Sequence, residues 1–211
     1  MHVVNMIGPP CARKSTVAAG LFYLMKSMGL RVELVTEFAK DMVWEGHFRL
    51  LDDQLFVFAE QNRRLHRLRD KVDFVITDSP LLLSAIYSPD SYPERFKDLV
   101  DDFFKTYENH VFFLHRIGPY STDGRLQMEH EAEALIPVLR DFLAERSVPY
   151  YDIEVPNLDG KLDLSQPAQD FLKAPVQILS MLHNALGDSL IDNPMPQKQT
   201  LPPINWSRCS C

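Results

Sequence analysis

The chain contains few cysteines, and its histidines show no pattern for binding a metal. The three cysteines, at positions 11, 209 and 211 of 211 residues, do not form a disulfide framework. The seven histidines are scattered without metal-ligand spacing, so we expect neither a zinc site nor a cysteine nucleophile. The sequence shows no signal peptide and no long apolar run. These absences predict an intracellular protein with no membrane partner.

The chain also lacks an excess of positive charge. Its 22 Lys and Arg residues stand against 29 Asp and Glu residues, which gives a formal net charge of −7. Bulk electrostatic attraction to a nucleic acid is therefore not expected, and any contact with DNA requires a local cationic patch. The best candidates crowd the far end of one expected helix, although such a group is more often a solvated face: Arg63, Arg64, Arg67 and Arg69.

Strand-like and helix-like segments alternate along the chain. We expect strands at 3–7, 32–35, 73–78, 111–114 and 149–155. We expect helices at 17–28, 38–44, 51–68, 93–107, 126–146 and 171–186, with Pro137 a kink or break in its helix. This alternation predicts an α/β fold of three layers, the P-loop NTPase fold. Its mostly parallel sheet has about five strands, with helices on both faces.

The same pass along the chain divides it into one domain and a tail. With 45% hydrophobic residues, the chain has enough apolar surface for one sizeable core. We assign residues 1–187 to this domain. Residues 188–211 are rich in Pro, Asn and Gln and are expected to form an extended or disordered tail.

The turn after the first strand contains the most informative pattern. A short apolar strand, a turn and a helix beginning at Lys-Ser-Thr have the layout of the phosphate-binding loop, G-x-x-x-x-G-K-[ST]. The backbone N–H groups of such a loop point at phosphate oxygens, its lysine contacts the β- and γ-phosphates, and its first hydroxyl binds Mg²⁺. The alternative is an ordinary surface turn. The pattern predicts ATP and Mg²⁺ binding by Gly8, Pro9, Pro10, Cys11, Ala12, Arg13, Lys14, Ser15 and Thr16, with Ser15 on the metal.

Two glycines that are usual in such a loop are absent. Arg13 occupies the second glycine position of the motif, and Cys11 stands where many such loops have another glycine. Glycine serves there for special backbone angles and a close approach to phosphate. We expect Arg13 to be tolerated if its backbone angle is ordinary, in which case its guanidinium adds a phosphate contact.

Acidic residues follow two other expected strands. Asp78 ends the third strand, where it can hold Mg²⁺ together with Ser15, or can instead cap the next helix. Glu37 follows the second strand, where it can accept a proton from an attacking hydroxyl, or can simply be favoured by a helix dipole. Because the carboxyl ends of parallel strands share one edge of a sheet, we expect both acids near the loop.

Two arginines follow the fourth expected strand. Arg116 comes directly after it, and Arg125 lies in a polar turn within a possible lid at about 117–127. A lid arginine can neutralise the charge that develops on a transferred phosphoryl group. The alternative for each is an ordinary solvated arginine.

Four segments of the chain resemble the small P-loop kinases of bacteriophages, which look like thymidylate and nicotinamide-riboside kinases. The segments are 8–16, 35–41, 75–81 and 119–125, and together they are similar to those of the 5-hydroxymethyl-deoxyuridine DNA kinases. The resemblance implies ATP-dependent phosphorylation of the hydroxymethyl group of 5-hydroxymethyluracil in phage DNA, a step in thymidine hypermodification. It favours Lys14, Glu37, Asp78, Arg116 and Arg125 as catalytic residues, and it implies the cytoplasm of an infected bacterium.

Two alternatives stay open at this point. Related families use the same scaffold to phosphorylate a free deoxynucleoside or deoxynucleotide, and the acidity of the chain suits such an acceptor. A loop impaired by Arg13 would instead make the protein a non-catalytic nucleotide-binding module. The sequence gives no indication of the oligomeric state.

Overall fold

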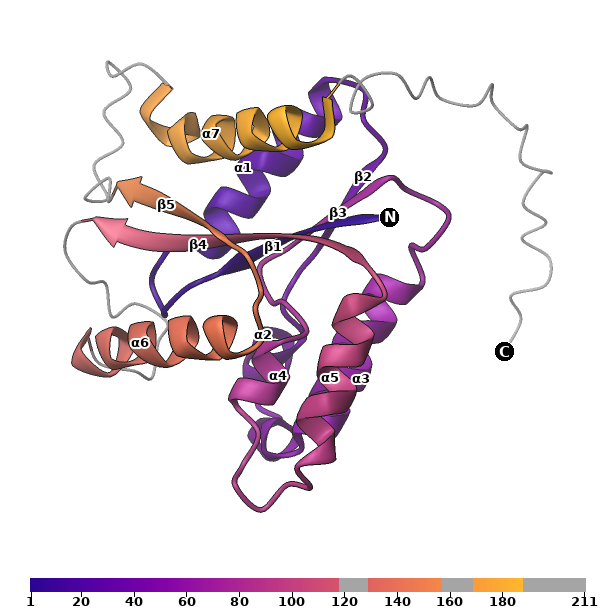
Figure 1. Ribbon diagram of the computed structural model, residues 1–211, viewed down its shortest axis with the longest axis vertical. Coiled ribbons are helices and arrows are strands. Elements are labelled where there is room, and N and C mark those ends of the chain that lie inside the picture. The colour runs from indigo at the N-terminus through magenta and orange to yellow at the C-terminus, as the bar shows by residue number, and fades with distance from the viewer. Residues whose placement is uncertain (118–128, 157–168, 188–211) are drawn as a thin grey trace.

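A five-stranded parallel sheet lies at the centre of the protein (Figure 1). The computed structural model describes residues 1–117, 129–156 and 169–187. The sheet has the order β2-β3-β1-β4-β5, and each pair of neighbouring strands is parallel. The strands are β1 (His2–Ile7), β2 (Val32–Val35), β3 (Phe74–Thr77), β4 (Glu108–Ile117) and β5 (Tyr151–Pro156). The α/β fold expected from the sequence is therefore confirmed.

Helices cover both faces of this sheet (Figure 1). One face packs against α1 (Lys14–Ser27) and α7 (Gln169–Leu186). The other packs against α3 (Gln54–His66), α4 (Leu83–Ile86), α5 (Arg95–Lys105) and α6 (Glu129–Glu145). The segments α2 (Phe38–Trp44) and η1 (Phe48–Asp52), a 3-10 helix, pack against α3. Within the described ranges, no helix has both the length and the apolar character needed to cross a membrane.

The core consists of two apolar layers, one on each side of the sheet. Along β1, Val4 and Met6 belong to the layer under α1 and α7, whereas Val3 and Ile7 belong to the layer under α3 to α6. Side chains alternate between the two faces of a strand, so a strand covered on both faces is apolar at nearly every position. This is why the strand-forming runs were readable in the sequence.

Proline lies inside two of the helices, and neither helix ends there. Of the kink or break expected at Pro137, the break is wrong, because α6 continues through that residue. A proline inside a helix costs about 3 kcal/mol, but α6 also buries Leu139 and Leu143. Each of these leucines contributes about 1.5–3 kcal/mol, which offsets the cost. In α7, Pro175 packs against Gly20 of α1, where an added Cβ would lie 2.9 Å from the Pro175 ring.

The expected helix over 51–68 is divided in the structure. The 3-10 helix η1 ends at Asp52, and α3 begins at Gln54 because the Asp53 carboxylate accepts a hydrogen bond from Phe56 N at 3.1 Å. The short helix α4 was not expected from the sequence. The expected tail, 188–211, lies outside the described residues, and so does the expected lid after Ile117.

Candidate functional site

The loop between β1 and α1 begins with a glycine that no other residue can replace. Gly8 has a φ of +152°, and an added Cβ would lie 2.6 Å from the carbonyl oxygen of Leu114 in β4. That distance is far inside van der Waals contact, and the obstacle is backbone, which cannot rotate away. Gly8 therefore lets the loop lie directly against β4.

The next residues form a tight turn with an unusual backbone. Ala12 N donates to Pro9 O at 3.3 Å, which closes a four-residue turn with Pro10 in its second position. Cys11, in the third position, has a φ of +64°. Proline followed by a residue with positive φ is the pattern of a type II turn. The buried Cys11 thus adopts a conformation that usually belongs to glycine.

Arg13 has a left-handed backbone as well. Its φ of 59° and ψ of 27° contradict the expectation of an ordinary angle. A non-glycine residue in this conformation costs about 1 kcal/mol. The geometry of the loop therefore persists without the second glycine of the motif, and the cost is carried as local strain at Arg13.

The N-terminus of α1 is open at the end of this loop. No side chain caps the helix, and its first turn contains no acidic residue. Ser15 and Thr16 are exposed there. The first N–H groups of a helix have no partners within it, and the helix dipole adds partial positive charge, so such an end binds anions.

Lys14 places its ammonium group at the mouth of the loop. Its Nζ donates to the carbonyl oxygens of Gly8 at 2.9 Å and Pro9 at 3.1 Å. Both acceptors are uncharged, and an ammonium group binds charged oxygens more strongly. A phosphate at this mouth can therefore take over the ammonium group from the loop carbonyls.

Asp78 follows the last residue of β3 and is almost completely buried. Only 4% of it is exposed, and its Oδ1 has no hydrogen-bond partner within the described part of the chain. A buried polar atom without a partner is rare, because it loses its hydration without compensation. A cation next to Asp78 would supply the missing interaction.

The residues at this point fit Mg²⁺. This ion takes oxygen ligands, keeps several waters, and is usually held by one or two carboxylates together with phosphates of the substrate. The Asp78 carboxylate and the Ser15 hydroxyl are oxygen donors of this kind. No group of three or more His, Cys, Asp or Glu residues suited to a metal occurs in the ranges that the structure describes, and such a group is not needed for a magnesium ion bound with a nucleotide.

Glu37 lies between β2 and α2, at the first residue before the helix. Its backbone is extended, with a φ of −63° and a ψ of 120°, and its side chain does not cap α2. Partial burial and the nearby Glu37 carboxylate raise the pKa of the Tyr87 phenol. The Glu37 carboxylate is therefore near enough to Tyr87, at the end of α4, to affect the charge of its phenol.

The sheet topology brings these residues to one crevice. The chain after β1 enters α1 on one face of the sheet, whereas the chain after β3 enters α4 on the other face (Figure 1). Neighbouring parallel strands whose connections diverge in this way leave a crevice at their carboxyl ends, which is where open α/β sheets bind ligands. The loop lies on one side and Asp78 on the other. Glu37 comes from β2, the next strand after β3.

The two arginines expected near the phosphates are only partly placed. Arg116 lies in the last part of β4, paired with Val155 of β5, so its backbone is at the same edge of the sheet. Arg125 lies outside the described residues.

The arginines near the end of α3 do not share one surface. Arg63 pairs with Glu60 at 2.9 Å and lowers the pKa of that carboxyl through their hydrogen bond. Arg64 pairs with Asp41 and covers the ring of Phe38. Farther along, the guanidinium of Arg69 lies 4.7 Å from the centre of the Tyr107 ring and donates to Thr106. The charges of these arginines are directed to different elements.

Gln61 is a residue of the site that the sequence analysis missed. It is 3% exposed, and its Oε1 accepts from Phe38 N at 2.9 Å. Its Nε2 donates to Thr36 O and to Thr77 Oγ1, both at 3.4 Å. The helical spacing that buries Val57, Phe58 and Leu65 also buries position 61. A glutamine on an otherwise apolar helix face was the signal that would have found it.

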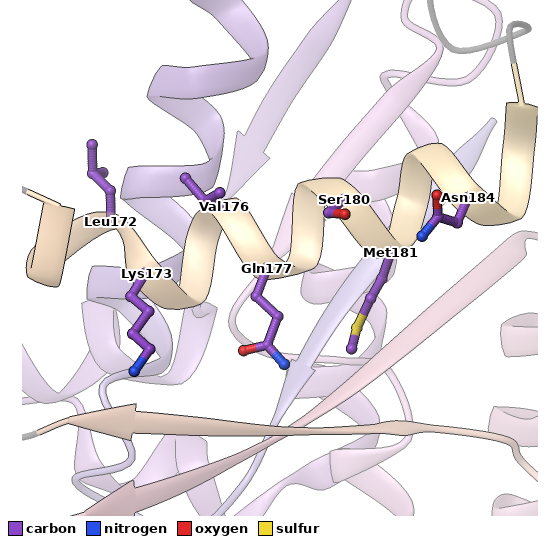
Figure 2. Close-up of a pocket in the computed structure, with 7 residues that line it drawn as sticks. All are labelled: Leu172, Lys173, Val176, Gln177, Ser180, Met181 and Asn184. Carbon is purple, nitrogen blue, oxygen red and sulfur yellow. The ribbon is translucent and has the colours of Figure 1, made fainter.

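A separate hollow runs along α7 (Figure 2). Among the residues that the structure describes, its lining comes from Leu172 to Asn184 of this helix, with Lys173, Gln177 and Met181 directed to one side. It contains none of the candidate site residues.

The chain matches one described family and is similar, at low identity, to several solved structures. A family model described as an AAA domain matches residues 3–159. No curated protein sequence matches the chain. Among solved structures, the YorR protein of Bacillus subtilis in complex with phosphorylated GDP is 18% identical over 86% of this chain and 98% of that one, with a TM-score of 0.48. Shikimate kinase from Aquifex aeolicus is 18% identical over 88% and 99%, with a TM-score of 0.46. Shikimate kinase from Acinetobacter baumannii in complex with shikimate is 19% identical over 87% and 93%, with a TM-score of 0.46.

Proposed function

Because this chain belongs to the AAA domain family, we propose that it is an ATP-dependent kinase with an alcohol group as acceptor. One observation carries the proposal: the Asp78 carboxylate is buried, its Oδ1 has no hydrogen-bond partner among the described residues, and it follows β3, the strand next to β1 and its loop. A module that only binds a nucleotide needs the loop. An orphaned buried acid is costly, and it is retained where a metal ion and a transferred phosphate must be held.

In this mechanism the loop holds the phosphates of ATP. The backbone N–H groups of Gly8 to Arg13 and the first turn of α1 face the phosphate oxygens. Lys14 exchanges its two carbonyl acceptors for oxygens of the β- and γ-phosphates. Ser15 and Asp78 hold Mg²⁺, which neutralises charge on the phosphates when it is bound.

Glu37 acts on the acceptor. We assign it the role of general base, which takes the proton of the acceptor hydroxyl while the oxygen of that hydroxyl receives the phosphoryl group. ADP leaves as the second product. Arg116 and Arg125 are proposed to neutralise the charge on the transferred group.

We propose as acceptor the hydroxymethyl group of 5-hydroxymethyluracil in DNA. The four segments that resemble the phage DNA kinases support it. Exposed aromatic rings after Glu37 support it as well, because Trp44 is 76% and Phe48 is 54% exposed, and Lys40 and Arg49 are exposed beside them in sequence. Aromatic rings can stack on a base that has left the duplex, and cations can contact its phosphates.

A free deoxynucleoside or deoxynucleotide is the second candidate acceptor. The net charge of −7 favours it, because DNA binding depends strongly on cationic contacts with phosphates. Arg63, Arg64 and Arg69 favour it too, since each of the three is engaged with a different neighbour.

The test is transfer of label from γ-labelled ATP. Duplex and single-stranded DNA containing 5-hydroxymethyluracil, the same DNA containing thymine, and a panel of free deoxynucleosides and deoxynucleotides are offered as acceptors. Label in the modified DNA alone is the expected result, and replacing Trp44 by Ala should raise the KM for that DNA. Label only in a free deoxynucleoside or deoxynucleotide would show that the acceptor is this small molecule and not DNA. If no acceptor receives label, the protein is better described as a non-catalytic nucleotide-binding module.

A further inference from the structure

One buried side chain connects the two strand ends that carry the proposed acids. Gln61, from the middle of α3, contacts Phe38 N and Thr36 O, the backbone groups on either side of Glu37. It also contacts Thr77 Oγ1, one residue before Asp78. The Thr77 hydroxyl in turn bonds to Ser79, one residue after Asp78, at 3.2 Å. Both acids are therefore flanked by one continuous network.

The partners of Gln61 determine the orientation of its amide. Phe38 N–H is a donor, so it requires the amide oxygen, and Thr36 O is an acceptor, so it requires the NH₂ group. The opposite orientation would place the amide NH₂ group against Phe38 N–H, two donors, and the amide oxygen against Thr36 O, two acceptors. Gln61 therefore has one arrangement that satisfies its neighbours, which makes it a rigid link between the ends of β2 and β3.

Arg64 shares part of this task, but only on one side. One helical turn after Gln61, it donates to Thr36 O at 3.3 Å and Thr36 Oγ1 at 3.4 Å, and it pairs with Asp41. Within the part of the chain that the structure describes, none of these contacts is with β3. Gln61 is therefore the residue of this helix face that spans both strand ends within the described contacts.

We propose that Gln61 is a positioning residue that sets the distance between the Glu37 base and the Asp78 carboxylate. This rests on the proposed function. Phosphoryl transfer requires the acceptor oxygen in line with the phosphate. In the proposed function Glu37 orients the acceptor hydroxyl, and Asp78 holds the Mg²⁺ that binds the phosphates. Without Gln61, the hydrogen bonds that join the turn at Glu37 to Thr77, next to Asp78, are lost.

The first test replaces Gln61 by Met, which has a similar shape and no hydrogen-bonding amide. Gln54→Met is the matched control, because Gln54 is at the start of the same helix and donates to Leu51 O, away from both acids. We expect Gln61→Met to lower kcat about tenfold or more, to raise the Mg²⁺ concentration for half-maximal rate, and to leave the KM for ATP within about twofold. The control should change none of these.

Two further measurements separate positioning from a general loss of stability. Hydrogen exchange of the Phe38 amide should become faster in Gln61→Met, because its acceptor is gone. If this variant does not fold, Thr77→Val takes its place, since it removes the hydroxyl that Gln61 contacts. A raised Mg²⁺ requirement in a folded variant supports the proposal. A folded Gln61→Met or Thr77→Val with parental kcat and Mg²⁺ response overturns it.

Failure of the proposed function gives a different result. In that case the parent protein itself transfers no phosphate to any acceptor. The proposal for Gln61 is then decided by binding of Mn²⁺ with ATP, followed by electron paramagnetic resonance. Weaker Mn²⁺ binding in Gln61→Met than in Gln54→Met supports a link to Asp78, and equal binding overturns it.

Discussion

The two sides of the candidate site use different kinds of chemical group. On the side of β1 and α1, the groups proposed to face a phosphate are mainly backbone N–H groups, and the loop has Cys11 and Arg13 at positive φ. On the side of β3, the groups are side chains: the buried carboxylate of Asp78 and the buried amide of Gln61. One side depends on backbone angles, and the other depends on particular functional groups.

This difference teaches where substitutions are tolerated. A backbone site accepts a change of residue type if the new residue can adopt the angle, at about 1 kcal/mol for a left-handed position. Gly8 is the exception, because the carbonyl of Leu114 fills the space of its Cβ. A side-chain site has no such freedom, because a buried group that loses its partner costs about 1–3 kcal/mol.

On the backbone side, Lys14 is proposed to act through its side chain. We expect Lys14→Ala to lower the rate of transfer about a hundredfold or more, which is about 2.7 kcal/mol in the barrier, because its cation faces the transferred phosphate. Lys26→Ala is the matched control, since Lys26 lies at the far end of the same helix and pairs with Glu33. Single-turnover rates of both variants decide it. A loss of less than about tenfold at Lys14 would contradict a conventional phosphate-binding loop.

Substitutions of Asp78 and Glu37 should affect different kinetic parameters. We expect Asp78→Asn to raise the Mg²⁺ requirement, because the amide is a weaker ligand than the carboxylate. Glu37→Gln should lower kcat about tenfold to a hundredfold or more, with little change in the KM for ATP, because it removes only the proton acceptor. Titrations of Mg²⁺ and ATP against both variants separate these roles. Full turnover in Glu37→Gln would reduce Glu37 to a structural residue.

Much of the fold was readable in the sequence, because burial on both faces makes each strand an apolar run. The ends of the strands also located the candidate residues, since parallel strands place the residues that follow them at one edge of the sheet. Helix boundaries were less accurate, because the start of α3 depends on the single hydrogen bond from Phe56 N to Asp53. The order of the strands came only from the structure.

The backbone of the loop and the role of Gln61 were not readable, for two different reasons. An arginine and a cysteine normally favour negative φ, and here the contact of the loop with β4 and its turn override that local preference. Gln61 has no sequence motif, and its importance comes from partners 16 to 25 residues away. Long-range contacts of this kind leave no periodic pattern.

The strain at Arg13 predicts a reversal of the usual effect of glycine. Replacing Arg13 by Gly or by Ala removes the same guanidinium, so their difference isolates the backbone. We expect the Gly variant to be more stable by about 1 kcal/mol, because glycine adopts positive φ freely. In the exposed middle of α1, Ala19→Gly should instead destabilise the protein by about 1 kcal/mol. Urea unfolding measures all three. Equal stability of the Gly and Ala variants would contradict the proposed strain at Arg13.

The same two variants test the guanidinium. If Arg13 contacts a phosphate, Gly and Ala at this position weaken ATP binding to the same extent, because both lack the cation. If only the backbone matters, the Gly variant binds ATP at least as tightly as the parent. Isothermal titration with ATP distinguishes these outcomes.

The smallest change is expected for the arginines at the end of α3. Arg63 is engaged with Glu60, and Arg67 ends the helix at an exposed position. Replacing both by Gln should leave the KM for modified DNA and its salt dependence unchanged. Replacing Lys40 and Arg49 by Gln removes the same charge beside the exposed rings of Trp44 and Phe48. This second pair should raise the KM for DNA and flatten the salt slope by up to about 0.9 for each lost phosphate contact. A larger effect of the Arg63 and Arg67 substitutions on the KM for DNA would indicate that DNA binds at α3. If neither pair changes this KM, a free deoxynucleoside is favoured as acceptor.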